Sequence, residues 1–107
     1  MPRGPEGKIQ DAAMEYARSK PGGFACKVES NYGGVPDTLL SFPASGPFMI
    51  EFKSPVGRAS GRQKEVHAQL RAAGVRVYLV RGSGSARKLI DDMADFGATN
   101  YPLAGEK

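Results

Sequence analysis

Residues 48–80 read FMIEFKSPVGRASGRQKEVHAQLRAAGVRVYLV, and this stretch decides the fold. Its two ends, FMIEFK and VRVYLV, are apolar runs of the composition that favours strands. Between them a polar loop leads into residues 62–74, where apolar residues recur at helical spacing before a terminal glycine. A strand, a helix and a second strand in this order predict a right-handed parallel crossover. Because VRVYLV is β-branched and strongly apolar, we expect it to lie centrally in the sheet.

The rest of the chain adds two helices and two strands by the same criteria. They are predicted at residues 6–20 (helix), 24–30 (strand), 38–42 (strand) and 85–97 (helix). The five residues PASGP separate the strand at 38–42 from FMIEFK, which is short enough for a hairpin. The order αβββαβα predicts an α/β fold with one mixed sheet flanked by helices. We expect a single domain over residues 1–107, with a flexible leader at 1–5 and a tail at 99–107.

Composition narrows the class of protein. The single cysteine, Cys26, excludes an intramolecular disulfide and a cysteine-based zinc site, and it fits a reducing, cytoplasmic setting. No apolar run approaches the ~20 residues of a membrane span, so we expect a soluble protein. The net charge of +4 is weak evidence for a polyanionic partner. In the strand at 24–30, alternation predicts Phe24, Cys26 and Val28 on the half-buried face and Lys27 on the opposite one.

Three charged residues stand in or beside strands, where unpaired buried charge is costly. Glu51 and Lys53 lie two residues apart on one strand, so they share a face and Phe52 points to the other. If the hairpin loop spans Pro43 to Ser45, Asp37 lies directly opposite Glu51. Like charges placed opposite one another are destabilising, and a divalent cation such as Mg²⁺ would reconcile them. The alternatives are a capping role for Asp37 and a surface salt bridge for Lys53.

The helices add polar residues to this group. Glu6 falls within the apolar arc of the first helix, which predicts that it faces the core, and a helix-dipole role is the alternative. Gln63 falls within the arc of the second helix, with helix capping as the alternative. His67, the only histidine, lies near the edge of the same arc, and we favour a packed or capping role over a catalytic one.

Together these residues resemble the PD-(D/E)xK nucleases, and within them the VRR-NUC domain. The resemblance covers nearly the whole chain and rests on Glu6 with Ile9 and Gln10, on GVPD ending at Asp37, on the ExK signature Glu51-Phe52-Lys53, and on Gln63. It implies a restriction-endonuclease-like core in which Mg²⁺ or Mn²⁺ is bound by Glu6, Asp37, Glu51 and the carbonyl of Phe52. It also implies that Lys53 positions or activates the attacking water, while Gln63 supports the site by hydrogen bonding.

The resemblance predicts a metal-dependent DNA endonuclease acting on branched or structured DNA, such as a Holliday junction or a flap. Stand-alone bacterial and phage members imply a homodimer in the cytoplasm of a bacterium or a phage-infected cell, with no small-molecule cofactor. Candidate nucleic-acid contacts are Lys27, Tyr32, Arg58, Arg62 and Lys64, for each of which plain exposure is the alternative. The competing hypothesis is a DNA-binding or assembly module that keeps the fold without turnover.

Overall fold

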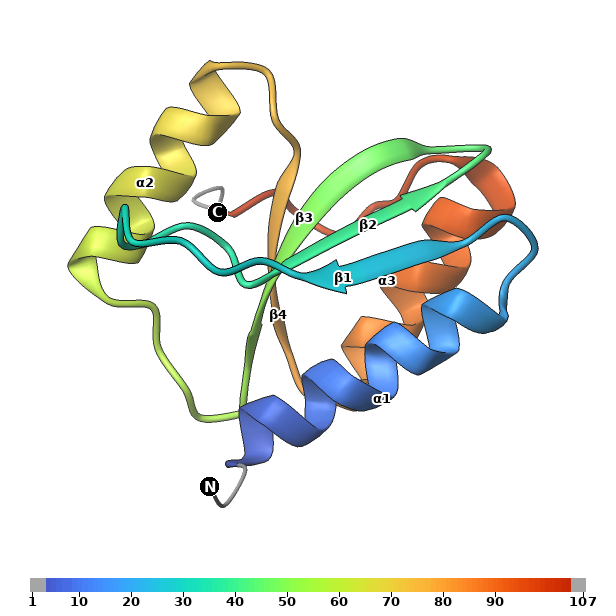
Figure 1. Ribbon diagram of the computed structural model, residues 1–107, viewed down its shortest axis with the longest axis horizontal. Helices are drawn as coiled ribbons and strands as arrows, with labels where there is room; N and C mark the ends of the chain where they lie inside the picture. The colour runs from blue at the N-terminus through green and yellow to red at the C-terminus, as the bar shows by residue number, and fades with distance from the viewer. Residues whose placement is uncertain (1–3, 105–107) are drawn as a thin grey trace.

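The structure is a computed structural model and describes residues 4–104, so the ends of the predicted leader and tail lie outside the described residues. Its elements follow the predicted order αβββαβα (Figure 1). They are α1 (Pro5–Ser19), β1 (Phe24–Lys27), β2 (Thr38–Phe42), β3 (Gly46–Lys53), α2 (Gly61–Ala72), β4 (Val77–Arg81) and α3 (Ser83–Phe96). The α/β class and the mixed sheet flanked by helices are therefore confirmed.

The four strands form one sheet in the order β1-β2-β3-β4. The β1–β2 and β2–β3 pairs are antiparallel, and β3 runs parallel to β4 across the connection through α2. In the hairpin, Phe42 pairs with Gly46 and Thr38 pairs with Ile50, which confirms the three-residue loop. The next opposed pair in this register is Asp37 with Glu51, where β2 begins.

The sheet has helices on both faces, but the two faces are covered unequally. Helices α1 and α3 lie side by side over one face, whereas α2 lies over the other face near the opposite end (Figure 1). The apolar core fills the space under α1 and α3, with Leu40, Phe48, Ile50 and Leu89 inaccessible to solvent. Phe52 points into this core, so Glu51 and Lys53 point to the α2 side, as the alternation along β3 requires.

The expected central position of VRVYLV is wrong, because β4 is an edge strand. Its outer edge is nevertheless covered by residues 101–104, from the segment that we predicted as a tail. The amide of Ala104 donates to the carbonyl of Val77 at 2.7 Å, and the hydroxyl of Tyr101 donates to the carbonyl of Leu79 at 3.1 Å. β4 can therefore be apolar although it is an edge strand, because residues 101–104 cover its outer edge.

The burial predicted for β1 is also wrong. Ala25 is buried, Phe24 is exposed and Cys26 is only half-buried. The face that carries Ala25 lies under α1, and Lys27 on that face forms an ion pair with Asp11 of α1 at 3.3 Å. Within residues 4–104, no helix covers the face of β1 that carries the larger side chains, because α2 packs against β4 instead. Alternation gave the two faces correctly, but side-chain size did not tell which one a helix covers.

Candidate active site

The pairing of β2 with β3 in the sheet brings the three charged residues of the sequence together. Asp37 immediately precedes β2, while Glu51 and Lys53 lie at the end of β3. The carboxyl groups of Asp37 and Glu51 are in hydrogen-bond contact, and the Lys53 ammonium lies 3.7 Å from Oε2 of Glu51. Glu51 and Lys53 are buried, with 5% and 9% of their surface exposed. Two carboxylates and a cation thus share one poorly solvated point.

Electrostatics show how this cluster behaves. Burial, followed by the charge of Asp37, raises the pKa of Glu51 to about 7, although Lys53 opposes the rise. Burial also raises the pKa of Asp37, against hydrogen bonds from Thr38, the backbone of Phe52 and Glu51. The pair therefore retains a proton, shared between the two carboxyls, above the pH at which isolated carboxyls lose theirs.

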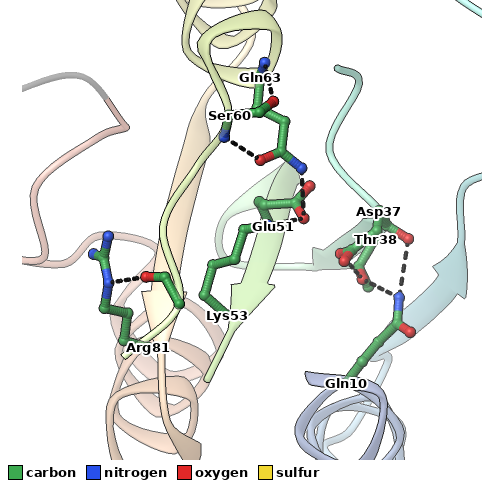
Figure 2. Close-up of polar contacts among 9 residues, drawn as sticks. Gln10, Asp37, Thr38, Glu51, Lys53, Ser60, Gln63 and Arg81 are labelled. Carbon is green, nitrogen blue, oxygen red and sulfur yellow. Dashed lines mark hydrogen bonds and ion pairs between the residues drawn. The ribbon is translucent and has the colours of Figure 1, made fainter. Parts of the chain in front are cut away.

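Asp37 is positioned from helix α1 by a pair of residues to which sequence reasoning gave no role. Nε2 of Gln10 donates to Oγ1 of Thr38 at 2.8 Å and to the carbonyl of Asp37 at 3.1 Å. The Thr38 hydroxyl in turn donates to Oδ1 of Asp37 at 2.8 Å, as Figure 2 shows. Gln10 and Thr38 are buried. The usable signal was the polar Gln10 at the edge of the apolar arc of α1.

Gln63 performs both of the roles that its sequence position suggested. Its backbone amide donates to Oγ of Ser60 at 3.1 Å while its Oε1 accepts from the Ser60 amide at 2.9 Å, which forms a capping box at the start of α2. Its Nε2 donates to Oε2 of Glu51 at 3.3 Å (Figure 2). The cap fixes the rotamer, so α2 delivers one amide group to the Glu51 carboxyl.

Glu6 does not face the core as predicted; it is exposed. Its carboxylate lies beside the loop after β3, where a Cβ on Gly57 would be 3.1 Å from Oε2 of Glu6 and 3.3 Å from Cβ of Lys53. The first turn of α1 therefore places the Glu6 carboxylate on the Lys53 side of the site, apart from the carboxyl pair of Asp37 and Glu51. Within residues 4–104, no group of three His, Cys, Asp or Glu side chains is gathered closely enough to hold a metal.

His67 lies closer to the charged cluster than its sequence position indicated. Only 2% of its surface is exposed, and its Nε2 has no hydrogen-bond partner within residues 4–104. Burial, together with the charge of Lys53, lowers the pKa of His67. The imidazole is thus neutral at pH 7. It is a buried side chain of α2, on the face of the sheet toward which Lys53 points.

The candidate nucleic-acid contacts fall into separate groups. Arg62 stacks over the ring of Tyr32 at 4.9 Å, donates to the Tyr32 carbonyl and pairs with Glu65. Arg58 and Lys64 are exposed, and neither forms an ion pair within residues 4–104. Lys27 lies with α1 on the other face of the sheet and is paired with Asp11. Of these candidates, Arg58 and Lys64 are therefore the cations that remain available to a ligand on the α2 side.

Comparison with known proteins places this arrangement in a family. The family model of the VRR-NUC domain matches residues 9–84, a span that contains Asp37, Glu51, Lys53 and Gln63. The chain belongs to the VRR-NUC family. A solved structure described as a VRR_NUC domain is similar over 80% of this chain and 94% of that one, with a TM-score of 0.71 and 27% identity. Among curated proteins, none matches the chain.

Membership in the VRR-NUC family implies a nuclease of the PD-(D/E)xK type, from a family that typically depends on divalent metals. The residues present fit such a cation, because the buried carboxyl of Glu51 and the half-buried carboxyl of Asp37 retain a proton that a cation would replace. Mg²⁺ is commonly held by one or two carboxylates while it keeps waters for substrate phosphate, so a pair is sufficient.

No helix among the described residues is long and apolar enough to cross a membrane.

Proposed function

We propose that the protein is a metal-dependent DNA endonuclease that hydrolyses phosphodiester bonds in branched or structured DNA. The observation that carries this proposal is the contact between the Asp37 and Glu51 carboxyls beside the Lys53 ammonium. A salt bridge between Lys53 and Glu51 would account for those two residues, but it does not account for the carboxyl of Asp37 beside them. The +4 charge of the chain favours a polyanionic substrate.

In this proposal Asp37 and Glu51 would hold Mg²⁺ or Mn²⁺, with the Phe52 carbonyl as a further ligand. The bound cation would lower the pKa of a water molecule and neutralise charge on the phosphate. Lys53 would orient the attacking water and stabilise negative charge that develops on the phosphate oxygens. Gln63 would keep the Glu51 carboxylate in a fixed orientation, and Gln10 would do the same for Asp37 through Thr38.

The test is cleavage of labelled four-way junctions, flaps and duplexes with Mg²⁺ or Mn²⁺, and with EDTA as the metal-free control. Wild-type protein should cut at least one branched structure, and Lys53→Ala should lose ~10²-fold or more of the rate while it keeps its fold. Lys88→Ala, which removes an exposed lysine of α3, is the matched control and should cut normally. If wild-type protein binds DNA but cuts none of the panel with either metal, the non-catalytic binding module is the better description.

We also propose that the protein acts as a homodimer, because resolving a four-way junction requires two cuts from paired sites. Light scattering at the concentrations used for cleavage should give about twice the mass of 11.4 kDa. A monomer that still cuts flaps would exclude the dimer and the resolution of junctions, but not the nuclease activity.

A further inference from the structure

A cavity of about 830 Å³ lies beside the carboxylate pair, between α2, β4 and the segment at 101–104. Its volume falls within the range of about 300–1,000 Å³ that is usual for small-ligand sites. In the parallel pairing, Leu79 lies next to Glu51 and Arg81 lies next to Lys53. Neighbouring residues in register project from the same face, and adjacent strands are ~4.8 Å apart. The cavity therefore begins one strand away from the carboxylates.

The charged part of the cavity lining is entirely cationic. Arg58, Lys64 and Arg81 line it together with His67, and no Asp or Glu among residues 4–104 does. Arg81 donates from Nε to the carbonyl of Gly57 at 2.9 Å, as Figure 2 shows, which leaves its two terminal amino groups for a ligand. Within residues 4–104 no carboxylate pairs with Arg58, Lys64 or Arg81. The buried Nε2 of His67 adds a polar atom that has no partner there.

The remaining lining is apolar and fixed in place. Leu79, Tyr101 and Leu103 are among its apolar residues, and the Tyr101 hydroxyl donates to the Leu79 carbonyl at 3.1 Å. Tyr101 also packs edge-on against the ring of Tyr78, with the centroids 6.3 Å apart. Inorganic phosphate would use the cations and leave this apolar surface exposed to water. A nucleotide supplies a phosphate for the cations and a base for the apolar wall.

We propose that this cavity binds one nucleotide of the nucleic acid, next to the phosphate at the carboxylate pair. A base inside a continuous duplex is stacked on both sides and must first be flipped out, at a cost in free energy, before it can enter a pocket. The cavity therefore favours a substrate that already presents an unstacked nucleotide beside the cut, as a flap or a single-stranded end does. This inference rests on the proposed nuclease function and narrows its substrate class.

The test measures binding in EDTA, where cleavage does not occur, by calorimetry with wild-type protein. The probes are deoxythymidine monophosphate, inorganic phosphate and deoxythymidine. We expect the monophosphate to bind at least ~10-fold more tightly than either of the other two, because only it contacts both parts of the lining. Equal affinity for inorganic phosphate and the monophosphate would overturn the inference, and so would no binding of the monophosphate.

Two variants separate the two parts of the lining. The double variant Arg58→Gln/Lys64→Gln should weaken the monophosphate at least ~10-fold, whereas Lys8→Gln/Lys88→Gln removes the same charge from exposed positions of α1 and α3 and should change little. Leu103→Ser should weaken the monophosphate without changing inorganic phosphate. If the α1/α3 double variant weakens binding equally, net charge is responsible and the pocket is excluded. Thermal unfolding checks that each variant is folded.

Failure here is distinguishable from failure of the nuclease proposal. A protein that cuts DNA with Mg²⁺ but binds no mononucleotide in EDTA loses the cavity as a nucleotide site and remains a nuclease. Specific mononucleotide binding by a protein that cuts nothing supports the cavity and removes the nuclease proposal, leaving the binding module.

Discussion

At the scale of single residues, the site depends on a carboxyl pair that is unfavourable without a cation. Asp37 and Glu51 are in contact in a poorly solvated position, and the raised pKa of both groups measures the cost of ionising them there. Their opposition was predictable from the sequence, because a three-residue loop fixes the hairpin register and the register fixes the pair. The contact between the two carboxyl groups in the structure agrees with this register.

The first prediction follows from the pKa of Glu51, which rises from 4.5 to about 7 on folding. Between these values the folded, metal-free protein binds more protons than the unfolded chain, so its free energy of unfolding falls as pH rises through this window. At about 1.4 kcal/mol per pKa unit, the fall is on the order of 3 kcal/mol. Urea unfolding in EDTA at a series of pH values measures it.

Variants separate Glu51 from other sources of this pH dependence. Glu51→Gln should flatten much of the dependence, whereas Glu65→Gln removes an exposed carboxylate and should leave it unchanged. Stability in EDTA that stays constant from about pH 5 to about pH 8 would contradict a carboxyl pair of this kind.

The second prediction concerns Gln10, which the sequence placed at the edge of an apolar arc without assigning it a role. Its bonds to Thr38 and to the Asp37 carbonyl join residues 27 or 28 positions apart, and local spacing does not reveal such contacts. Gln10→Met keeps the side-chain length but removes the donor, so it should cost about 1–3 kcal/mol and weaken Mn²⁺ binding by releasing Asp37. Urea unfolding and calorimetry measure these two effects.

Gln69→Met is the matched control for Gln10→Met, because Gln69 is an exposed glutamine of α2. It should leave both the stability and the Mn²⁺ affinity near those of the wild type. Wild-type values for Gln10→Met would show that α1 does not position Asp37.

At the scale of elements, the loop between β1 and β2 holds Asp37 by packing against α2. A Cβ at Gly34 would lie 2.7 Å from the Arg62 carbonyl oxygen and 2.8 Å from Cγ2 of Val66. The sequence has two adjacent glycines here, Gly33 and Gly34, but it does not show which segment they approach. In the same way, the apolar character of β4 was evident, but its edge position was not. Both depend on contacts between segments distant in the chain, which strand composition does not encode.

The third prediction uses the two adjacent glycines of that loop. Gly33 and Gly34 both have left-handed backbones, with φ of +83° and +79°, but a Cβ at Gly33 would meet only Nε of Arg62, at 3.7 Å. Gly33→Ala should therefore cost about 1–2 kcal/mol for its backbone alone. Gly34→Ala should cost a further ~1–3 kcal/mol, because the Arg62 backbone must move. Urea unfolding of both variants gives the difference, and equal costs would mean that the loop does not pack on α2 as described.

At the scale of the whole molecule, several lysines are neutralised by aspartates, whereas two cations on the α2 side and Lys8 of α1 have no carboxylate partner within residues 4–104. Lys20, Lys27 and Lys88 are each paired with an aspartate at 2.7–3.3 Å. Arg58 and Lys64 have no such partner within residues 4–104. A polyanion is therefore attracted to the face that carries the carboxylate pair, whose own negative charge would otherwise repel it. This division depends on which charges the fold brings together, and net charge did not predict it.

The fourth prediction is that a divalent cation stabilises the whole fold through this pair. At 100 times its dissociation constant, a bound ion adds about 2.7 kcal/mol, and a domain of this size gains ~4–8 °C in Tm for each kcal/mol. At about pH 8, Mg²⁺ or Mn²⁺ should raise the Tm of wild-type protein by roughly 10 °C or more, with no rise in Glu51→Gln. Lys53→Ala should keep the rise, because it loses a cation and no ligand, so metal binding would separate from cutting. No shift in wild-type protein with either ion, measured by scanning calorimetry against EDTA, would show that the carboxyl pair does not bind a cation.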